Sequence, residues 1–266
     1  MNLRASPEPL SPSPLRRRGE GDEVKLKQAQ TNYWYTMIEY ITKNWWKLLS
    51  GLCLIYAVIF GFIVPVPEIG NLYNTIRNLF FHVGMWFAML TLFLTSFVYS
   101  LKYLSGFNEK YDVRTVEAVN IGLLFGILGI LTGMIWAKAT WGVYWVRDPK
   151  LDGAAVGIFI YLAYLVLRGS VEDTRKRAKV SAVYNIFAFV LLIVFLMILP
   201  RLQESVHPAG RGKGNPVLPM ELDPMMRTVF YPAMIGWILL GYWIWQIRVK
   251  IHELKITIES EENGIK

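Results

Sequence analysis

This 266-residue chain contains three histidines, His82, His207 and His252. A neutral imidazole is a common metal ligand. His82 lies four residues inside a charge-free run that begins at Asn78. An ionisable group within an apolar run is costly unless it has a partner. His82 is therefore either a ligand or a neutral imidazole bonded to a nearby carbonyl. His207 lies in a segment rich in proline and glycine, and His252 lies among charged residues, where we expect it to be solvated.

A second feature is an aromatic segment, Thr140 to Asp152, which reads TWGVYWVRDPKLD and follows Trp136. Tryptophan and tyrosine gather at membrane interfaces for generic reasons, so an interfacial belt is one interpretation. The other is a binding surface, because flat rings clustered at an aqueous boundary suit a planar, mostly apolar ligand with a polar edge. The residues alone leave both open.

The elements that must position these residues are apolar helices. Hydrophobic residues make up 54% of the chain and charged residues 18%, a balance that favours a membrane over water as solvent. Six runs lack Asp, Glu, Lys and Arg: 48–67, 78–101, 118–137, 153–167, 180–200 and 228–247. Roughly 20 apolar residues span a bilayer. The sequence therefore predicts an all-α integral membrane protein with six transmembrane helices and short extramembrane loops, the fourth span being short.

The distribution of Lys and Arg predicts the orientation, because the cytoplasmic side keeps the excess. With both termini placed in the cytoplasm, 20 of the 28 basic residues fall on that side and 8 on the other. The outer connections are then 68–77, 138–152 and 201–227, and the last should be irregular because of its prolines and glycines. The net charge of +8 is accounted for by anionic lipid rather than nucleic acid.

Outside the spans, the sequence indicates two tails. Residues 1–43 are predicted to be a disordered basic tail and interfacial lead-in, 44–248 the six-span membrane domain, and 249–266 a cytoplasmic tail. The single cysteine, Cys53, excludes an internal disulfide and a CxxCH haem-attachment site. A phosphate loop of the GxxxxGK[ST] type does not occur, so energy from ATP would have to come from a partner.

Two segments carry a resemblance to a known family. The stretch from Trp141 to Asp148 resembles the WGxxWxWD signature of haem-handling proteins of cytochrome c biogenesis, with Arg147 where the pattern has a third tryptophan. The stretch RNLFFHVGMW, from Arg77 to Trp86, is similar to the segment of the CcmC family that contains its first ligand histidine. Together with six spans and this length, these segments identify the chain as similar to the CcmC family.

The resemblance implies a function. It implies that a non-covalent, b-type haem lies at the outer face of a bacterial cytoplasmic membrane, with its iron held by His82 and His207. It implies delivery to a periplasmic haem chaperone, CcmE, with an ABC transporter made of CcmA and CcmB, and no catalysis by this chain. The further haem-contacting residues it implies are Trp136, Trp141, Gly142, Tyr144, Trp145, Arg147 and Asp148.

Three other functions remain open at this stage. A haem lyase that joins haem to apocytochrome would need more spans and more histidines. A respiratory cytochrome b would hold its ligands on facing transmembrane helices, whereas His207 lies in a loop rich in proline and glycine. A transporter subunit without resident haem would need only an aromatic belt.

Overall fold

In the computed structural model, which describes residues 18–68, 72–207, 221–262 and 264, the chain is helical. The elements are α1 (Arg18–Ile63), η2 (Tyr73–Asn78), α2 (Leu79–Gly106), α3 (Glu109–Trp141), α4 (Pro149–Gly169), α5 (Thr174–Ile193), η3 (Val194–Ile198), α6 (Leu199–Leu202) and α7 (Pro224–Glu262). Among the described residues no strand occurs. Within the part of the chain that the structure describes, six helical segments are long and apolar enough to cross a membrane, in agreement with the six predicted spans.

The chain divides into two compact units, Met1–Trp45 and Trp46–Lys266. In the first unit, residues 18–43 form the beginning of α1, in a region where the sequence indicated a disordered tail. Helical geometry is interrupted at Asn44 (φ −117°, ψ 15°), whose side-chain amide donates to the Tyr40 carbonyl at 2.8 Å. At the other end of the chain, α7 continues to Glu262, well past the expected boundary at residue 248.

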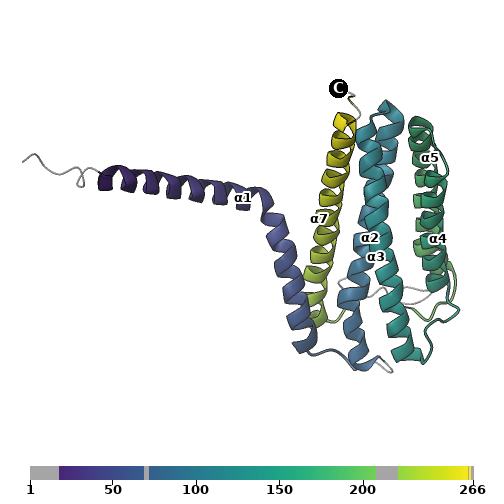
Figure 1. Ribbon diagram of the computed structural model, residues 1–266. Helices are drawn as coiled ribbons and strands as arrows, with labels where there is room; N and C mark the ends of the chain where they lie inside the picture. Colours follow the sequence, from purple (N-terminus) through teal and green to yellow (C-terminus); the bar gives the residue numbers. More distant parts are fainter. Residues whose placement is uncertain (1–17, 69–71, 208–220, 263, 265–266) are drawn as a thin grey trace, which may run out of the picture. The chain divides into compact units, whose positions relative to one another are not determined.

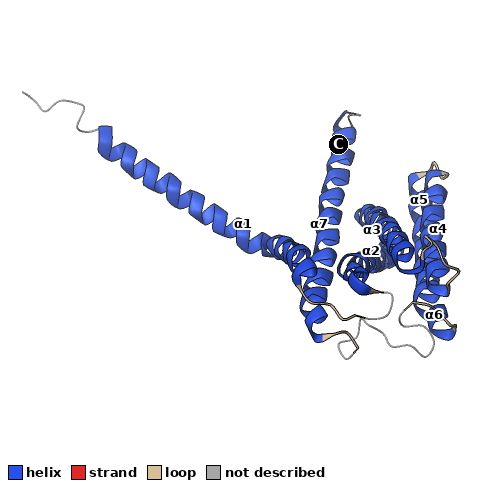
Figure 2. Cartoon of the chain, turned by 90° about the horizontal axis from the view of Figure 1, so that it is seen from below, coloured by secondary structure: helices blue, strands red, loops and turns tan. Residues whose placement is uncertain are grey.

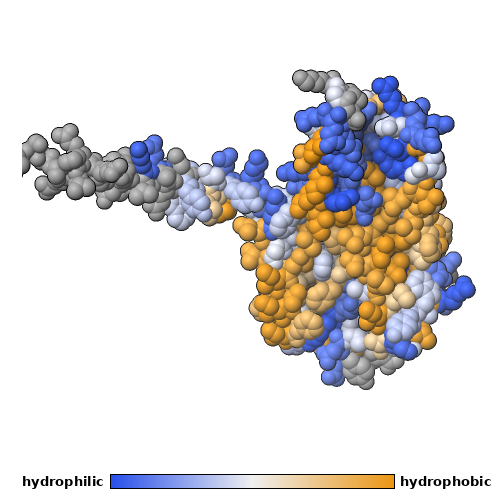
Figure 3. Space-filling model, viewed as in Figure 1, coloured by the Kyte–Doolittle hydropathy of each residue, from blue (hydrophilic) through white to orange (hydrophobic). Residues whose placement is uncertain are grey.

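The second unit is a helical bundle in which α2 and α3 lie between α7 on one side and the α4–α5 pair on the other (Figures 1 and 2). Residues 46–63 of α1 pack on α7, where the Ser50 hydroxyl donates to the Gly236 carbonyl at 3.0 Å. Apolar side chains cover the middle of the visible bundle face, and hydrophilic residues gather toward its ends (Figure 3). This distribution is that of a multi-pass membrane protein.

Close packing of α2 against α3 depends on four glycines of α3. A Cβ atom added at Gly122 would lie 2.6 Å from Phe93, and one added at Gly126 would lie 2.9 Å from Met89. A Cβ atom added at Gly129 would lie 2.9 Å from Trp86, and one added at Gly133 would lie 2.7 Å from His82. Each glycine thus leaves space for a large side chain of α2, and Gly126 also leaves space for Ile158 of α4, whose Cδ1 would lie 2.3 Å from the added Cβ. The spacing of the glycines matches the spacing of the side chains on the antiparallel α2. Small residues of this kind let membrane helices approach closely. We call these four glycines the glycine ladder. Its last member, Gly133, lies against the His82 ring.

Polar contacts inside the bundle tie helices that are distant in sequence. Asn185 of α5 donates to the Ser100 hydroxyl of α2 at 2.9 Å and lies within 3.2 Å of the Ser96 hydroxyl. Such contacts between membrane helices are worth roughly 0.6 kcal/mol each on average. A stacked pair of rings, Phe93 and Tyr161, with centroids 3.6 Å apart, joins α2 to α4.

His252 was expected to be solvated, but its side chain is only 34% exposed and contacts a buried carboxylate. Its Nδ1 lies 2.7 Å from Oε1 of the buried Glu117 on α3, whose Oε2 accepts from Arg248 at 2.9 Å. The charged neighbours in sequence were a poor guide, because α7 packs against α3 and brings a buried carboxylate to the imidazole. His252, Arg248 and Glu117 thus form a polar cluster that joins α7 to α3.

Candidate functional site

The end of α1, the start of α2, the α3–α4 connection, the end of α6 and the start of α7 lie at one end of the bundle, which we call the site end (Figure 1). Both the aromatic segment and His207 belong to these connections, and His82 lies in the first turn of α2. The topology therefore brings all the predicted site residues to the same end. Residues 208–220 of the third connection, for which we expected irregular structure, lie outside the described residues.

The aromatic segment begins where α3 ends. Gly142 adopts a left-handed conformation (φ 80°), and its N–H donates to the Lys138 carbonyl at 3.1 Å. A glycine here ends the helix at little cost, because a side chain would disfavour positive φ. The Lys138 ammonium donates back to the Gly142 carbonyl at 2.7 Å and lies 5.5 Å from the centroid of the Tyr144 ring. The turn thus separates Trp141, at the end of the helix, from the exposed residues that follow.

Asp148 contacts several residues of the site end. It is the N-cap of α4, accepting from the Lys150 N–H at 2.9 Å, with Pro149 as the first helical residue. An Asp-Pro pair at these two positions favours helix initiation. Although its side chain is only 1% exposed, the same carboxylate also accepts from the Ser205 hydroxyl at 2.8 Å and from the Val206 N–H at 2.7 Å. One carboxylate therefore both starts α4 and holds the segment that follows α6.

The electrostatics of Asp148 follow from these contacts. Burial raises the pKa of its carboxyl. The hydrogen bonds from Ser205 and from two backbone N–H groups, together with His207, lower the pKa by more than burial raises it, so the net pKa lies below its ordinary value. The carboxyl is therefore ionised at neutral pH. A buried carboxylate of this kind attracts the N–H of a neighbouring imidazole.

His207 lies against that carboxylate and between two indoles. Its Nδ1 is 3.3 Å from Oδ1 of Asp148. Its ring centroid lies 5.0 Å from that of Trp141 and 5.9 Å from that of Trp136. With Nδ1 turned to the carboxylate, Nε2 is the nitrogen through which a metal could be bound. A carboxylate behind a ligand histidine is a common arrangement in metal sites, since it fixes the ring and increases its basicity.

His82 lies between α2 and α3 with both ring nitrogens engaged. Its Nδ1 is 3.1 Å from the Thr132 hydroxyl, and its Nε2 accepts from the Trp86 indole N–H at 3.3 Å. Gly133 provides the hole for its ring. His82 is thus held in a defined orientation in the first turn of α2.

The segment of α3 between Thr132 and Trp136 links the two histidines. Thr132 contacts His82, and Trp136, four residues further along the same helix, contacts His207. The structure therefore brings His82 and His207 into one neighbourhood although 125 residues separate them in sequence.

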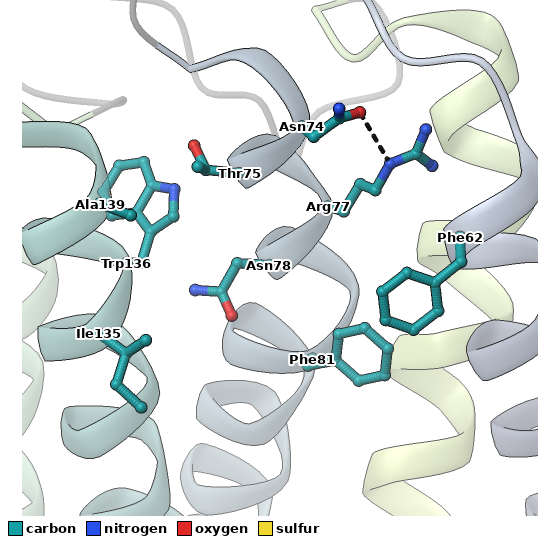
Figure 4. Close-up of a pocket in the computed structure, with 9 residues that line it drawn as sticks. All are labelled: Phe62, Asn74, Thr75, Arg77, Asn78, Phe81, Ile135, Trp136 and Ala139. Carbon is teal, nitrogen blue, oxygen red and sulfur yellow. Dashed lines mark hydrogen bonds between the residues drawn. The ribbon is translucent and has the colours of Figure 1, made fainter.

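An open pocket of about 550 Å³ lies beside this neighbourhood, between α1, η2–α2 and α3 (Figure 4). Phe62, Phe81, Ile135 and Trp136 form its apolar walls, and Asn78, the last residue of η2, also lines it. Ligand pockets for small molecules commonly have such a size and such an apolar lining. Arg77 borders the pocket, but its guanidinium donates to the Gly61 and Val64 carbonyls at 2.7 Å each.

The remaining predicted site residues lie further out. Tyr144 and Trp145 are 56% and 36% exposed, and Arg147 is exposed as well. The Trp145 indole donates to Asp152 at 3.0 Å. The aromatic segment therefore has two parts: Trp141 packs with Trp136 against His207, and Tyr144, Trp145 and Arg147 face outward.

Sequence reasoning missed Trp86, Thr132 and Ser205 as neighbours of the histidines. The placement of Trp86 four residues after His82 was a usable signal, since side chains at that spacing share a helix face. For Thr132 and Ser205 no signal of comparable strength exists in the sequence, because their roles depend on which helices pack together.

Comparison with known proteins agrees with this arrangement. The family model described as "CcmC: Heme exporter protein C" matches residues 25–264. Heme exporter protein C of Paracoccus denitrificans is 23% identical over 202 residues, covering 76% of this chain and 82% of that protein. The protein of the same name from Escherichia coli K12 is 23% identical over 216 residues, covering 77% and 81%.

A plant relative matches a shorter stretch. The cytochrome c biogenesis protein CcsA of Pelargonium hortorum is 32% identical over 117 residues, covering 44% of this chain and 36% of that protein. The match of the family model over nearly the whole chain decides the assignment: this multi-pass membrane protein belongs to the CcmC family of heme exporter proteins.

Proposed function

We propose that this protein holds haem at the site end of the bundle, with His82 and His207 as the two axial ligands, and delivers it for cytochrome c maturation. The observation that carries the proposal is the matched environment of the two imidazoles. Each has its Nδ1 directed to an oxygen, of Thr132 in one case and Asp148 in the other, so that Nε2 is the nitrogen that would bind iron. The donor set therefore fits a haem iron with two neutral imidazole ligands.

Two axial imidazoles suit carriage, because they leave no open position on the iron for oxygen chemistry. Haem is then non-covalently held, b-type cargo, and the chain is a delivery protein and not an enzyme. Trp136 and Trp141 supply flat apolar surface beside His207, and the pocket of Figure 4, which Trp136 also lines, supplies further apolar walls. The contribution of this chain is to orient the imidazoles and to exclude water from them.

Delivery requires a receiving protein. In our proposal the outward-facing residues Tyr144, Trp145 and Arg147 meet the haem chaperone CcmE, and CcmA and CcmB drive separation of the loaded complex. The site end then faces the periplasm and both termini lie in the cytoplasm, as the excess of basic residues on the opposite side supports. The membrane is the bacterial cytoplasmic membrane.

A transfer experiment tests this function. The protein in nanodiscs would be loaded with haem and mixed with a tagged soluble domain of the chaperone, and haem in the separated chaperone would be measured by absorbance. We expect transfer from the wild type and none from the double variant His82→Ala/His207→Ala. A protein that acquires no haem would favour a permease with an aromatic belt, and transfer by the double variant would refute the ligand assignment.

A further inference from the structure

The hydrogen bond from Trp86 to His82 occupies the nitrogen that iron would need. Both residues lie on α2, four positions apart, and the indole N–H points at Nε2 from 3.3 Å with the two ring planes at 79°. An indole N–H is a donor only, so the nitrogen it meets must present a lone pair. In the haem-free protein, the lone pair of His82 is therefore already engaged.

The other side of the ring explains why Nε2 is the nitrogen that carries the lone pair. The Thr132 hydroxyl donates its proton to backbone carbonyls of its own helix, at 2.8 Å to Leu128 and 3.1 Å to Gly129. Its oxygen is thus left to accept, and the proton between Thr132 and His82 belongs to Nδ1. Thr132 and Trp86 consequently select the same neutral tautomer of His82.

Both rings are held in place by the glycine ladder. A Cβ at Gly129 would lie 2.9 Å from Cε2 of Trp86, and a Cβ at Gly133 would lie 2.7 Å from Cε1 of His82. The indole and the imidazole therefore sit in adjacent holes of α3, where neither can turn freely. The hydrogen bond is a consequence of helix packing and not of a chance rotamer.

We infer that Trp86 is a positioning residue whose indole N–H occupies the His82 lone pair when haem is absent. This hydrogen bond must break when iron binds. The inference rests on the proposed role of His82 as a ligand. Trp86 keeps the lone pair in the orientation that Thr132 selects, and its N–H competes with iron for that lone pair. Loading therefore costs one hydrogen bond that is regained on release, which lowers affinity for haem and favours its transfer onward.

The variant Trp86→Phe tests this role, since it keeps an aromatic ring over Gly129 but removes the N–H. The matched control is Trp237→Phe, which removes an indole N–H that donates to the Phe80 carbonyl from the neighbouring α7. One hydrogen bond has a net worth that corresponds to about a threefold to tenfold change in a binding constant. We expect Trp86→Phe to bind haem about threefold to tenfold more tightly than wild type, and Trp237→Phe to bind it as wild type does.

A readout without haem is the ¹⁵N spectrum of the labelled histidines in nanodiscs. In Trp86→Phe the Nε2 resonance of His82 should shift as its hydrogen bond is lost, while Nδ1 stays protonated. In Thr132→Val the proton should distribute over both nitrogens. An unchanged Nε2 resonance in Trp86→Phe, or haem affinity that is equal or weaker, would overturn the inference.

The variant His82→Ala separates this inference from the proposed function. If His82→Ala alters the haem spectrum but Trp86→Phe leaves affinity unchanged, only the role of Trp86 is refuted. If His82→Ala leaves both spectrum and affinity unchanged, His82 is no ligand and both proposals are refuted.

Discussion

Replacing Gly133 by alanine probes the fit between α3 and the His82 imidazole. The new methyl group would lie 2.7 Å from Cε1 of His82, so the ring must retreat by about 0.7 Å to reach an ordinary contact of 3.4 Å or more. Thr132 and Trp86 hold the ring at 3.1 and 3.3 Å, and a displacement of that size breaks at least one of these hydrogen bonds.

The expected magnitude follows from two opposing effects. Overpacking a well-packed site costs about 1 to 3 kcal/mol, and alanine in place of glycine inside a helix recovers about 0.5 to 1 kcal/mol. We therefore expect Gly133→Ala to lower the free energy of unfolding by about 0.5 to 2 kcal/mol. The displaced ring no longer directs Nε2 toward the iron, and loss of the competing Trp86 hydrogen bond offsets this only in part. We therefore expect haem affinity to fall by about 2-fold to 30-fold.

The assay is a pair of measurements in nanodiscs, thermal unfolding without haem and a haem titration followed by absorbance. Gly122→Ala is the matched control, because its methyl group would lie 2.6 Å from Phe93 in the same ladder but away from the histidine. It should lose stability and keep its haem affinity. Gly51→Ala, with no atom within 4 Å of the new Cβ, sets the baseline for both. Equal haem affinities for Gly133→Ala and Gly122→Ala would refute the reasoning.

Three further predictions concern the rest of the site end and the orientation. Asp148→Asn removes the charge that faces His207 and weakens the hydrogen bonds to the 205–207 segment, so haem affinity should fall about 10-fold to 100-fold; an unchanged titration would show that the carboxylate only caps α4. Replacing Trp141 and Trp145 together by alanine should abolish haem transfer to the chaperone while insertion into the membrane continues, and normal transfer would favour the interfacial belt. A periplasmic reporter fused after Arg175 should be inactive, because the segment 168–179 is predicted to be cytoplasmic. Activity of this fusion would show that the orientation is inverted.

The sequence was sufficient to predict the spans, because each is a long run without charge and a bilayer tolerates little else. It also identified Asp148 through the signature, though not the reason for its presence. The Asp-Pro pair indicates a helix start, but the second role, accepting from Ser205 and Val206, depends on α6 ending beside α4. Contacts of that kind depend on how helices pack and cannot be found along the chain.

His252 and Trp86 show the two ways in which local reasoning failed. For His252, charged neighbours in sequence suggested water, but the nearest charge in space is Glu117, 135 positions away. For Trp86, the spacing from His82 was visible, yet an aromatic residue in an apolar helix gives no sign of its importance until Gly129 shows where the ring must lie.

The most direct test of the central claim is the electron paramagnetic resonance spectrum of the haem-loaded ferric protein, compared with His82→Ala and His207→Ala. We predict a low-spin signal with two imidazole ligands in the wild type, its loss in each single variant, and its partial return when free imidazole fills the vacated position. A wild-type signal that persists in either single variant would remove that histidine from the iron and contradict the account.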